Sequence, residues 1–202
     1  MRKLIKIVAD IIILVCVIGL YVLAAKFIYT NFRERKRKEI TDGIIDKIDK
    51  KIDDIKKEDN SLQTEADVKY NGTHYTVLGK LNIKKINFYQ PILKEKTSYA
   101  YNVSVVKIKG PDLNEEGNFV IGGHNYMRKV FFMKINKLTK GDVINITDLN
   151  GRSINYYVYE YKVTSADDSS YLKDIEDGGK YITLVTCNYG GKERYIVKAK
   201  AK

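Results

Sequence analysis

The pattern of apolar and polar positions changes twice along the chain. Residues Ile11 to Ala25 contain no charged residue. The apolar run extends from Leu4 to Tyr29 when the lysines near its ends reach toward water. At about 1.5 Å of rise per residue, this longer run crosses a hydrocarbon core of roughly 30 Å. The pattern predicts an uncleaved membrane anchor in residues 1–30, with a cleaved signal peptide as the alternative.

A second pattern follows in residues 31–69, which we interpret as a charged helical stalk and linker. Ile45, Ile48, Ile52 and Ile55 recur at the spacing of one helix face, with Asp and Lys between them. We expect this amphipathic helix to pack its isoleucine stripe on the next domain, and a self-associating coiled coil is the alternative. Asn60 to Lys69 is polar without periodicity, which predicts a linker.

From residue 70 to residue 202 the apolar positions alternate with period two, which predicts strands. Asn150-Gly151 is the strongest hairpin signal, and the apolar positions of Phe131 to Leu138 fit one short helix. About eight strands are expected, over residues 76–83, 88–92, 102–108, 118–124, 143–147, 153–163, 181–187 and 194–199. The predicted fold class is all-β, a closed or nearly closed barrel with one or two short helices.

The charge of the chain is strongly basic, with 36 Lys and Arg against 25 Asp and Glu and a net charge of +11. Such a charge suits an anionic neighbour such as lipid headgroups or an acidic polymer. Nucleic acid is not expected, because no RNA-binding signature or zinc-finger spacing accompanies the charge. Two His and two Cys provide neither a metal quartet nor a disulfide framework, so we expect no metal and no cofactor.

Three residues of the alternating region are candidates for a catalytic site. The apolar run Tyr181 to Cys187 ends on a thiol at the edge of a sheet, and the other cysteine, Cys16, lies in the apolar helix. A neighbouring cation lowers the pKa of a thiol, which makes the reactive thiolate more abundant. His124 can move a proton near neutral pH, and Arg194 can hold an oxyanion with its planar fork. Attack on an amide would give a thioester that water or an amine resolves.

The same residues also have an alternative interpretation in which their roles are purely structural. A cysteine that ends an apolar strand is usually a packed small hydrophobe, and a histidine after two glycines can serve in a turn. A non-catalytic basic module that binds anionic wall polymer or lipid is therefore an alternative function, and a cysteine wall peptidase is another.

The order of these residues resembles the sortase family, the membrane-anchored cysteine transpeptidases of Gram-positive cell envelopes. The resemblance covers about Gly79 to Lys200. It is carried by Thr183-Leu-Val-Thr-Cys187, which is similar to the family's Thr-Leu-x-Thr-Cys signature, by Gly122-Gly-His124-Asn125, and by the arginine-led strand Arg194-Tyr-Ile-Val.

This resemblance implies an eight-stranded sortase barrel and a role for each candidate residue. Cys187 would be the nucleophile that cleaves an LPxTG-like sorting motif after its threonine. His124 would be the acid/base partner, Arg194 would hold the acyl carbonyl or oxyanion, and Thr186 is a candidate substrate contact. The implied partners are surface proteins with a sorting motif, an amine acceptor such as a peptidoglycan precursor, and the membrane. The enzyme would anchor proteins to the cell wall.

Some features depart from the family or conflict with it. Only six residues separate Cys187 from Arg194, so the subclass stays open between class B-like and D-like. Some sortases bind calcium through loop carboxylates, but we expect the equivalent carboxylates here to be solvated. They are Asp112, Glu115, Glu116, Asp174, Glu176 and Asp177. The resemblance places the catalytic domain outside the cell, whereas more basic residues follow the apolar run than precede it, which by count favours the cytoplasm.

Overall fold

The computed structural model describes residues 1–57, 62–126, 130–188 and 190–202. Its residues form two compact units, Met1–Glu39 and Ile40–Lys202. Helix α1 (Arg2–Lys57) is continuous, so the expected anchor and amphipathic helix belong to one element. The helix contains an 18-residue window with a mean hydropathy of 2.9, long and apolar enough to cross a membrane. This candidate span fits a membrane-anchored protein.

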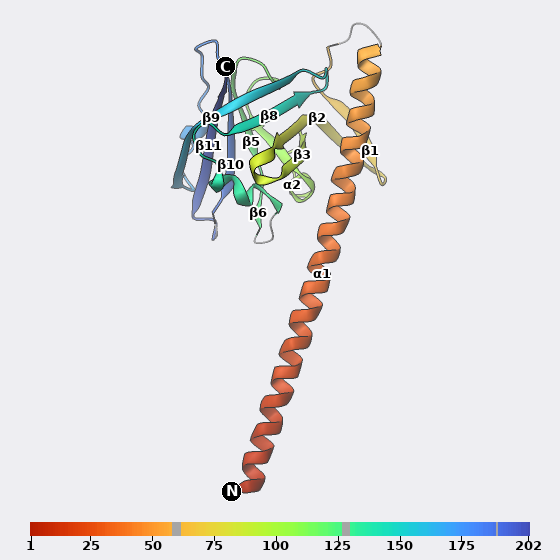
Figure 1. Cartoon of the computed structure of the whole chain (residues 1–202), viewed down its shortest axis with the longest axis vertical. Helices are drawn as coiled ribbons and strands as arrows, with labels where there is room; N and C mark the ends of the chain where they lie inside the picture. The colour runs from red at the N-terminus through yellow and green to blue at the C-terminus, as the bar shows by residue number, and fades with distance from the viewer. Residues whose placement is uncertain (58–61, 127–129, 189) are drawn as a thin grey trace. The chain divides into compact units, whose positions relative to one another are not determined.

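Eight strands of the second unit close into the predicted barrel (Figure 1). Around the barrel they are β2 (Thr73–Ile83), β3 (Phe88–Leu93), β4 (Val105–Lys109), β5 (Gly117–Gly122), β10 (Lys180–Cys187), β11 (Glu193–Ala201), β9 (Ser153–Ser165) and β8 (Val143–Asp148). Closure occurs because the second half of β2 pairs with both β3 and β8. The pairs β3–β4 and β5–β10 are parallel, and the other pairs are antiparallel.

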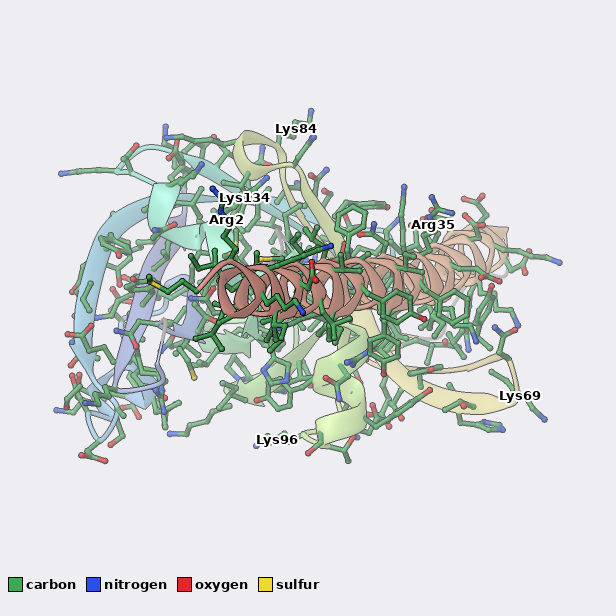
Figure 2. All side chains as sticks on the ribbon, turned by 90° about the horizontal axis from the view of Figure 1, so that it is seen from below. Arg2, Arg35, Lys69, Lys84, Lys96 and Lys134 are labelled. Atoms are coloured by element: carbon green, nitrogen blue, oxygen red, sulfur yellow. The ribbon has the colours of Figure 1, made fainter. Side chains whose placement is uncertain are left out.

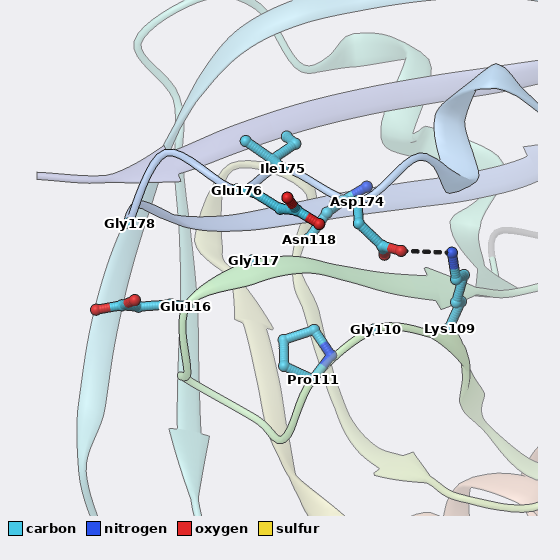
Figure 3. Close-up of a pocket in the computed structure, with 10 residues that line it drawn as sticks. All are labelled: Lys109, Gly110, Pro111, Glu116, Gly117, Asn118, Asp174, Ile175, Glu176 and Gly178. Carbon is cyan, nitrogen blue, oxygen red and sulfur yellow. Dashed lines mark hydrogen bonds and ion pairs between the residues drawn. The ribbon is translucent and has the colours of Figure 1, made fainter.

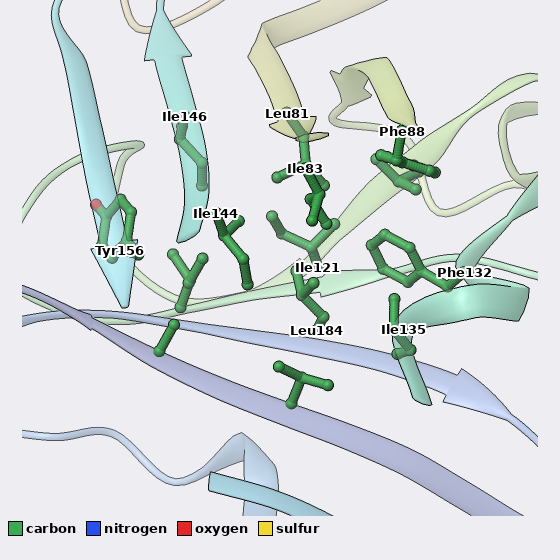
Figure 4. Close-up of a cluster of buried hydrophobic side chains, with 14 of the residues drawn as sticks. Leu81, Ile83, Phe88, Ile121, Phe132, Ile135, Ile144, Ile146, Tyr156 and Leu184 are labelled. Atoms are coloured by element: carbon green, nitrogen blue, oxygen red, sulfur yellow. The ribbon is translucent and has the colours of Figure 1, made fainter. Parts of the chain in front are cut away.

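The barrel interior holds the main hydrophobic core, drawn in Figure 4. Leu81, Ile121 and Leu184 are fully buried there. Burying a side chain of this size stabilises the fold by about 1.5–3 kcal/mol relative to exposure. The short helix expected near residues 131–138 is the 3₁₀ helix η2 (Phe132–Lys137), and the ring of Phe132 lies 5.4 Å from that of Phe88. Helix η2 thus adds apolar side chains to the core from outside the sheet.

A second hydrophobic cluster forms where the C-terminal part of α1 packs on the outside of the sheet. Ile44, Ile48 and Ile52 of the helix are buried in this cluster. Gly43 allows the close approach, because a Cβ at this position would lie 2.0 Å from the Tyr70 ring. The isoleucine stripe therefore packs on the domain as expected, although the side chain of Ile55 lies outside the described residues. The compact unit includes the chain from Ile40 onward.

Two local predictions were wrong. The polar segment expected to be a linker contains strand β1 (Ala66–Tyr70), which pairs with the first half of β2. The strand expected from Asn102 begins only at Val105, because helix α2 (Ser98–Val103) precedes it. The Thr97 hydroxyl caps α2 by accepting a hydrogen bond of 3.1 Å from the Ala100 N–H. Such an N-cap satisfies a backbone donor that the helix itself leaves unpaired.

The remaining short elements lie in the connections of the barrel. They are η1 (Lys84–Ile86), β6 (Asn125–Tyr126), β7 (Val130–Phe131) and η3 (Ser170–Leu172). Strands β6 and β7 pair with each other directly after β5.

Candidate active site

Strand β10 brings Cys187 to the outer face of the barrel at one end. Ile182 and Leu184 of this strand belong to the interior core, whereas Val185 belongs to a separate small cluster. Because side chains alternate between the two faces of a strand, Cys187 shares the outer face with Val185. It is the last residue of β10, and its side chain is exposed. The thiol therefore lies at the edge of the sheet, as the sequence predicted.

The parallel pairing of β5 with β10 brings His124 to the same end. The register places Gly122 beside Val185, and the histidine and the cysteine each follow two residues later. Val120 of β5 also belongs to the outer cluster, so the alternation continues toward His124 on that face. Residues 63 positions apart in the sequence thus lie at the same end of two neighbouring strands.

Hydrogen bonds fasten these two strand ends to each other. The Gly123 N–H donates to the Val185 carbonyl over 3.2 Å, and the Thr186 hydroxyl donates to the Gly123 carbonyl over 2.6 Å. The Asn125 amide donates to the Cys187 carbonyl over 2.6 Å. Thr186 is 2% exposed, so its hydroxyl fixes the backbone before His124 from inside the barrel. The Gly123 backbone and the Asn125 side chain, on either side of the histidine, are therefore attached to β10.

The imidazole of His124 lies among aromatic rings. The ring of Tyr101 on α2 lies 5.3 Å away at an interplanar angle of 47°, and Phe131 makes an edge contact at 6.1 Å. Partial burial lowers the pKa of His124 below its ordinary value of 6.5. Burial has this effect because it penalises the charged imidazolium. A neutral imidazole near pH 7 can accept the proton of a thiol.

Arg194 lies directly across from Cys187 on β11. Next to this pair, the Asn188 N–H donates to the Glu193 carbonyl over 2.9 Å. In this structure the Arg194 guanidinium donates to the carbonyls of Gly191 and Glu193, over 2.9 and 3.1 Å. The three predicted site residues therefore lie on three adjacent strands or strand ends.

The outer face next to Cys187 carries a small apolar cluster. It consists of Val120, Val185 and Ile196 on the strands, with Ile108, Tyr171 and Leu172 packed against them. The connection that carries η3 is attached there by Asn118, whose amide donates to the carbonyls of Tyr171 and Lys173, both over 3.1 Å. Val120, Val185 and Ile196 are buried, so this cluster attaches the connection that carries η3 to the outer face of the sheet.

The opposite end of the β5–β10 pair has a pocket of about 650 Å³ (Figure 3). It is lined by Lys109, Gly110, Pro111, Glu116, Gly117, Asn118, Asp174, Ile175, Glu176 and Gly178. Lys109 forms an ion pair of 2.8 Å with Asp174 in this pocket, and Arg152 forms one of 2.5 Å with Glu115. Within the described residues, no group of three or more potential ligands is placed to hold a metal. Lysine and arginine side chains thus pair with several of the loop carboxylates that we expected to be solvated.

Sequence reasoning missed one residue of the site, Tyr101. It is one of 16 tyrosines, and nothing in its local pattern marks it. Its contact with His124 depends on α2, an element that the sequence did not predict.

Comparisons with known proteins agree with this geometry. Residues 81–202 match the sortase domain family. Sortase A of Bacillus anthracis is 33% identical over 127 residues, which cover 60% of this chain and 58% of that protein. Sortase SrtE2 of Streptomyces coelicolor is 30% identical over 109 residues, covering 48% of this chain and 42% of that protein. The chain thus spans about half the length of these curated relatives.

Solved sortase structures share the fold. A Clostridium perfringens sortase D5 transpeptidase has a TM-score of 0.61 and 30% identity, covering 82% of this chain and 98% of that one. Streptococcus agalactiae sortase C1 has a TM-score of 0.57 and 26% identity, covering 62% and 69%. These proteins carry different class letters, so the subclass stays open. Since the family match covers more than half of the 202 residues, the chain belongs to the sortase family.

Proposed function

We propose that this protein is a cysteine transpeptidase that cleaves a sorting motif and transfers the acyl group to an amine. The observation that carries the proposal is the exposed Cys187 at the end of β10, with His124 and Arg194 at the neighbouring strand ends. Family membership supports the reaction class, and the LPxTG-like motif is the substrate that the family suggests.

The reaction begins with transfer of the Cys187 proton to the neutral His124 imidazole. The thiolate attacks the carbonyl carbon of the scissile amide, and the negative charge moves to the carbonyl oxygen. The Arg194 guanidinium then donates to this oxyanion in place of a backbone carbonyl, because a charged donor favours an anionic acceptor. As the C–N bond breaks, His124 returns its proton to the leaving amine, and a thioester remains on Cys187.

The second half of the reaction releases the acyl group. An acceptor amine attacks the thioester carbonyl and loses a proton to His124, and the Cys187 thiolate leaves and is protonated again. We propose an amine on a peptidoglycan precursor or another protein as the acceptor, and a surface protein with a sorting motif as the donor. The product would then be a surface protein anchored to the cell wall. Thr186, proposed from the sequence as a substrate contact, supports the site through the Gly123 carbonyl.

We place the catalytic unit on the outer side of the membrane, where sorting-motif proteins and wall precursors meet. The apolar segment in α1 supports the membrane anchor. The excess of basic residues after that segment opposes this orientation, so a protease-protection assay on intact cells is its direct test.

A basic module that binds anionic polymer receives less support. Lys84 and Lys96 project to opposite sides of the barrel in Figure 2, whereas polymer binding favours basic residues along one face.

The test uses the full chain in detergent, a panel of sorting-motif peptides and a glycine-peptide amine. We expect cleavage and amine transfer with the wild type and with Cys16→Ser, and neither with Cys187→Ala. Turnover that survives Cys187→Ala contradicts the proposal. Hydrolysis without amine transfer, even at high amine concentration, identifies a cysteine peptidase instead.

A further inference from the structure

Tyr101 lies beside the candidate catalytic histidine. It lies in α2, between β3 and β4, and its side chain packs against the hydrophobic cluster beneath α1. Its ring contacts the imidazole of His124 at 5.3 Å. One side of Tyr101 therefore belongs to a hydrophobic cluster, and another side faces the site.

The hydroxyl of Tyr101 lies over the backbone of β5. A methyl group on Gly122 would lie 3.2 Å from this hydroxyl oxygen and 2.6 Å from Cδ1 of Ile108. Because Gly122 has no side chain, the hydroxyl reaches the outer face of the β5–β10 pair. Cys187 lies on that same face, two residues beyond the Val185 that pairs with Gly122. The hydroxyl thus lies on the thiol's side of the sheet.

Burial, and then the charges around it, keep this hydroxyl a donor. Burial raises the pKa of Tyr101, and the negative charges that Tyr171 and Cys187 would carry raise it further. Tyr101 is therefore protonated at neutral pH. The titratable groups on the elements around Tyr101 are His124 after β5, Cys187 on β10, Arg194 on β11, Tyr171 in the connection before β10, Tyr99 on α2, and Lys107 and Lys109 on β4.

We propose that Tyr101 is a positioning residue whose ring orients His124 and whose hydroxyl stabilises the thiolate of Cys187. The inference rests on the proposed function of the Cys187 site. When His124 takes the thiol proton, the tilted tyrosine ring stabilises the imidazolium by a cation–π interaction. The hydroxyl, as a neutral donor on the same face, favours the accompanying thiolate. Tyr101 thus favours the pair of Cys187 thiolate and His124 imidazolium over the pair of neutral thiol and neutral imidazole.

The experiment measures the rate of Cys187 alkylation by iodoacetamide against pH in the full chain with Cys16→Ser. This readout needs no peptide substrate, so it is independent of whether the protein proves to be a transpeptidase. Tyr101→Phe removes only the hydroxyl, and Tyr101→Leu also removes the ring. Tyr99→Phe is the matched control, because Tyr99 lies on the same helix but stacks on Tyr75, at 5.9 Å.

We expect Tyr101→Phe to lower the alkylation rate at neutral pH about threefold with an unchanged melting temperature. Tyr101→Leu should lower it about tenfold and shift the alkylation profile to higher pH. Tyr99→Phe should leave the profile unchanged. Where peptide turnover is measured, the Tyr101 variants should lower kcat while KM changes little.

An alkylation profile of Tyr101→Phe that matches the wild type overturns the role of the hydroxyl. If Tyr101→Leu is unfolded, Tyr101→Met replaces it as the variant without a ring. An alkylation profile of the ringless variant that matches that of Tyr101→Phe overturns the role of the ring. If the wild type cleaves no peptide but the alkylation effects hold, only the proposed function fails.

Discussion

The two ends of the β5–β10 pair use opposite kinds of interaction. At the pocket end, carboxylates pair with cations, as in Lys109 with Asp174 at 2.8 Å. At the other end, the strands are fastened by neutral bonds to backbone carbonyls, such as Thr186 to Gly123 and Asn125 to Cys187. The first end neutralises its charges internally, whereas the second leaves the Cys187 side chain exposed.

This difference has a physical reason in the proposed reaction. A carboxylate next to the thiol would pair with Arg194 and would raise the pKa of Cys187, so both groups would become less useful. Neutral hydrogen bonds hold β5 to β10 without this competition, and the carboxylate of Glu193 beside Arg194 accepts from the Asn188 amide. The lesson is that the β5–β10 pair is fastened at the Cys187 end without an ion pair between the two strands.

The largest effect is expected from Arg194→Lys at the reactive end. A lysine keeps the charge but loses the planar fork, so it stabilises the oxyanion poorly. We expect peptide turnover to fall by about 100-fold or more, with a change in melting temperature below about 2 °C. Steady-state kinetics measure this, and Lys192→Ala in the same turn is the control. Full activity of Arg194→Lys would show that the reaction does not need the planar guanidinium.

The second largest effect is expected from the loss of the Thr186 hydroxyl on β10. Thr186→Val leaves the buried Gly123 carbonyl without its hydroxyl donor, which costs about 1–3 kcal/mol of unfolding free energy. We expect turnover to fall about tenfold, because the backbone before His124 loosens. Thr183→Val is the matched control, since its hydroxyl bonds to Asn118 at 2.8 Å, farther from the thiol. Equal losses of activity in both variants would contradict a specific role for Thr186.

A third effect is the titration of His124. Since burial lowers its pKa, the folded state takes up the proton only below pH 6.5. The contribution of His124 to the free energy of unfolding is thus complete above the unfolded value of about 6.5 and is lost as the pH falls below it. NMR of the imidazole signals measures the pKa, with His74→Gln assigning the two histidines. A His124 pKa above 6.5 would contradict the inferred burial.

The smallest effect is expected at the pocket end. The side chains of Lys109 and Asp174 are 47% and 55% exposed, so their ion pair contributes about 0–1 kcal/mol. Lys109→Met should change turnover less than about twofold. Added calcium should not raise the melting temperature of the wild type, because lysine and arginine already neutralise carboxylates there. A calcium-dependent rise would overturn this account of the pocket end.

The sequence predicted the barrel well, because its eight strands carry clear alternation between short turns. It missed β1, whose five residues are stabilised by pairing with β2 and by the cover of α1, contacts that lie far apart in the sequence. It missed α2 because six residues are too few to show a helical period. The motifs led to the proposal of Cys187, His124 and Arg194, but the parallel register that places the first two at the same sheet end was not predictable. Tyr101 stayed hidden because its role depends on α2.

The most direct test of the central claim is the capture of an acyl group on Cys187. The full chain is mixed with a sorting-motif peptide without amine, quenched in acid and examined by mass spectrometry after digestion. We predict that the fragment containing Cys187 gains the mass of the acyl part ending in threonine, and that the adduct disappears when amine is added. Cleaved peptide without any adduct on Cys187, or an adduct on another residue, would contradict the account.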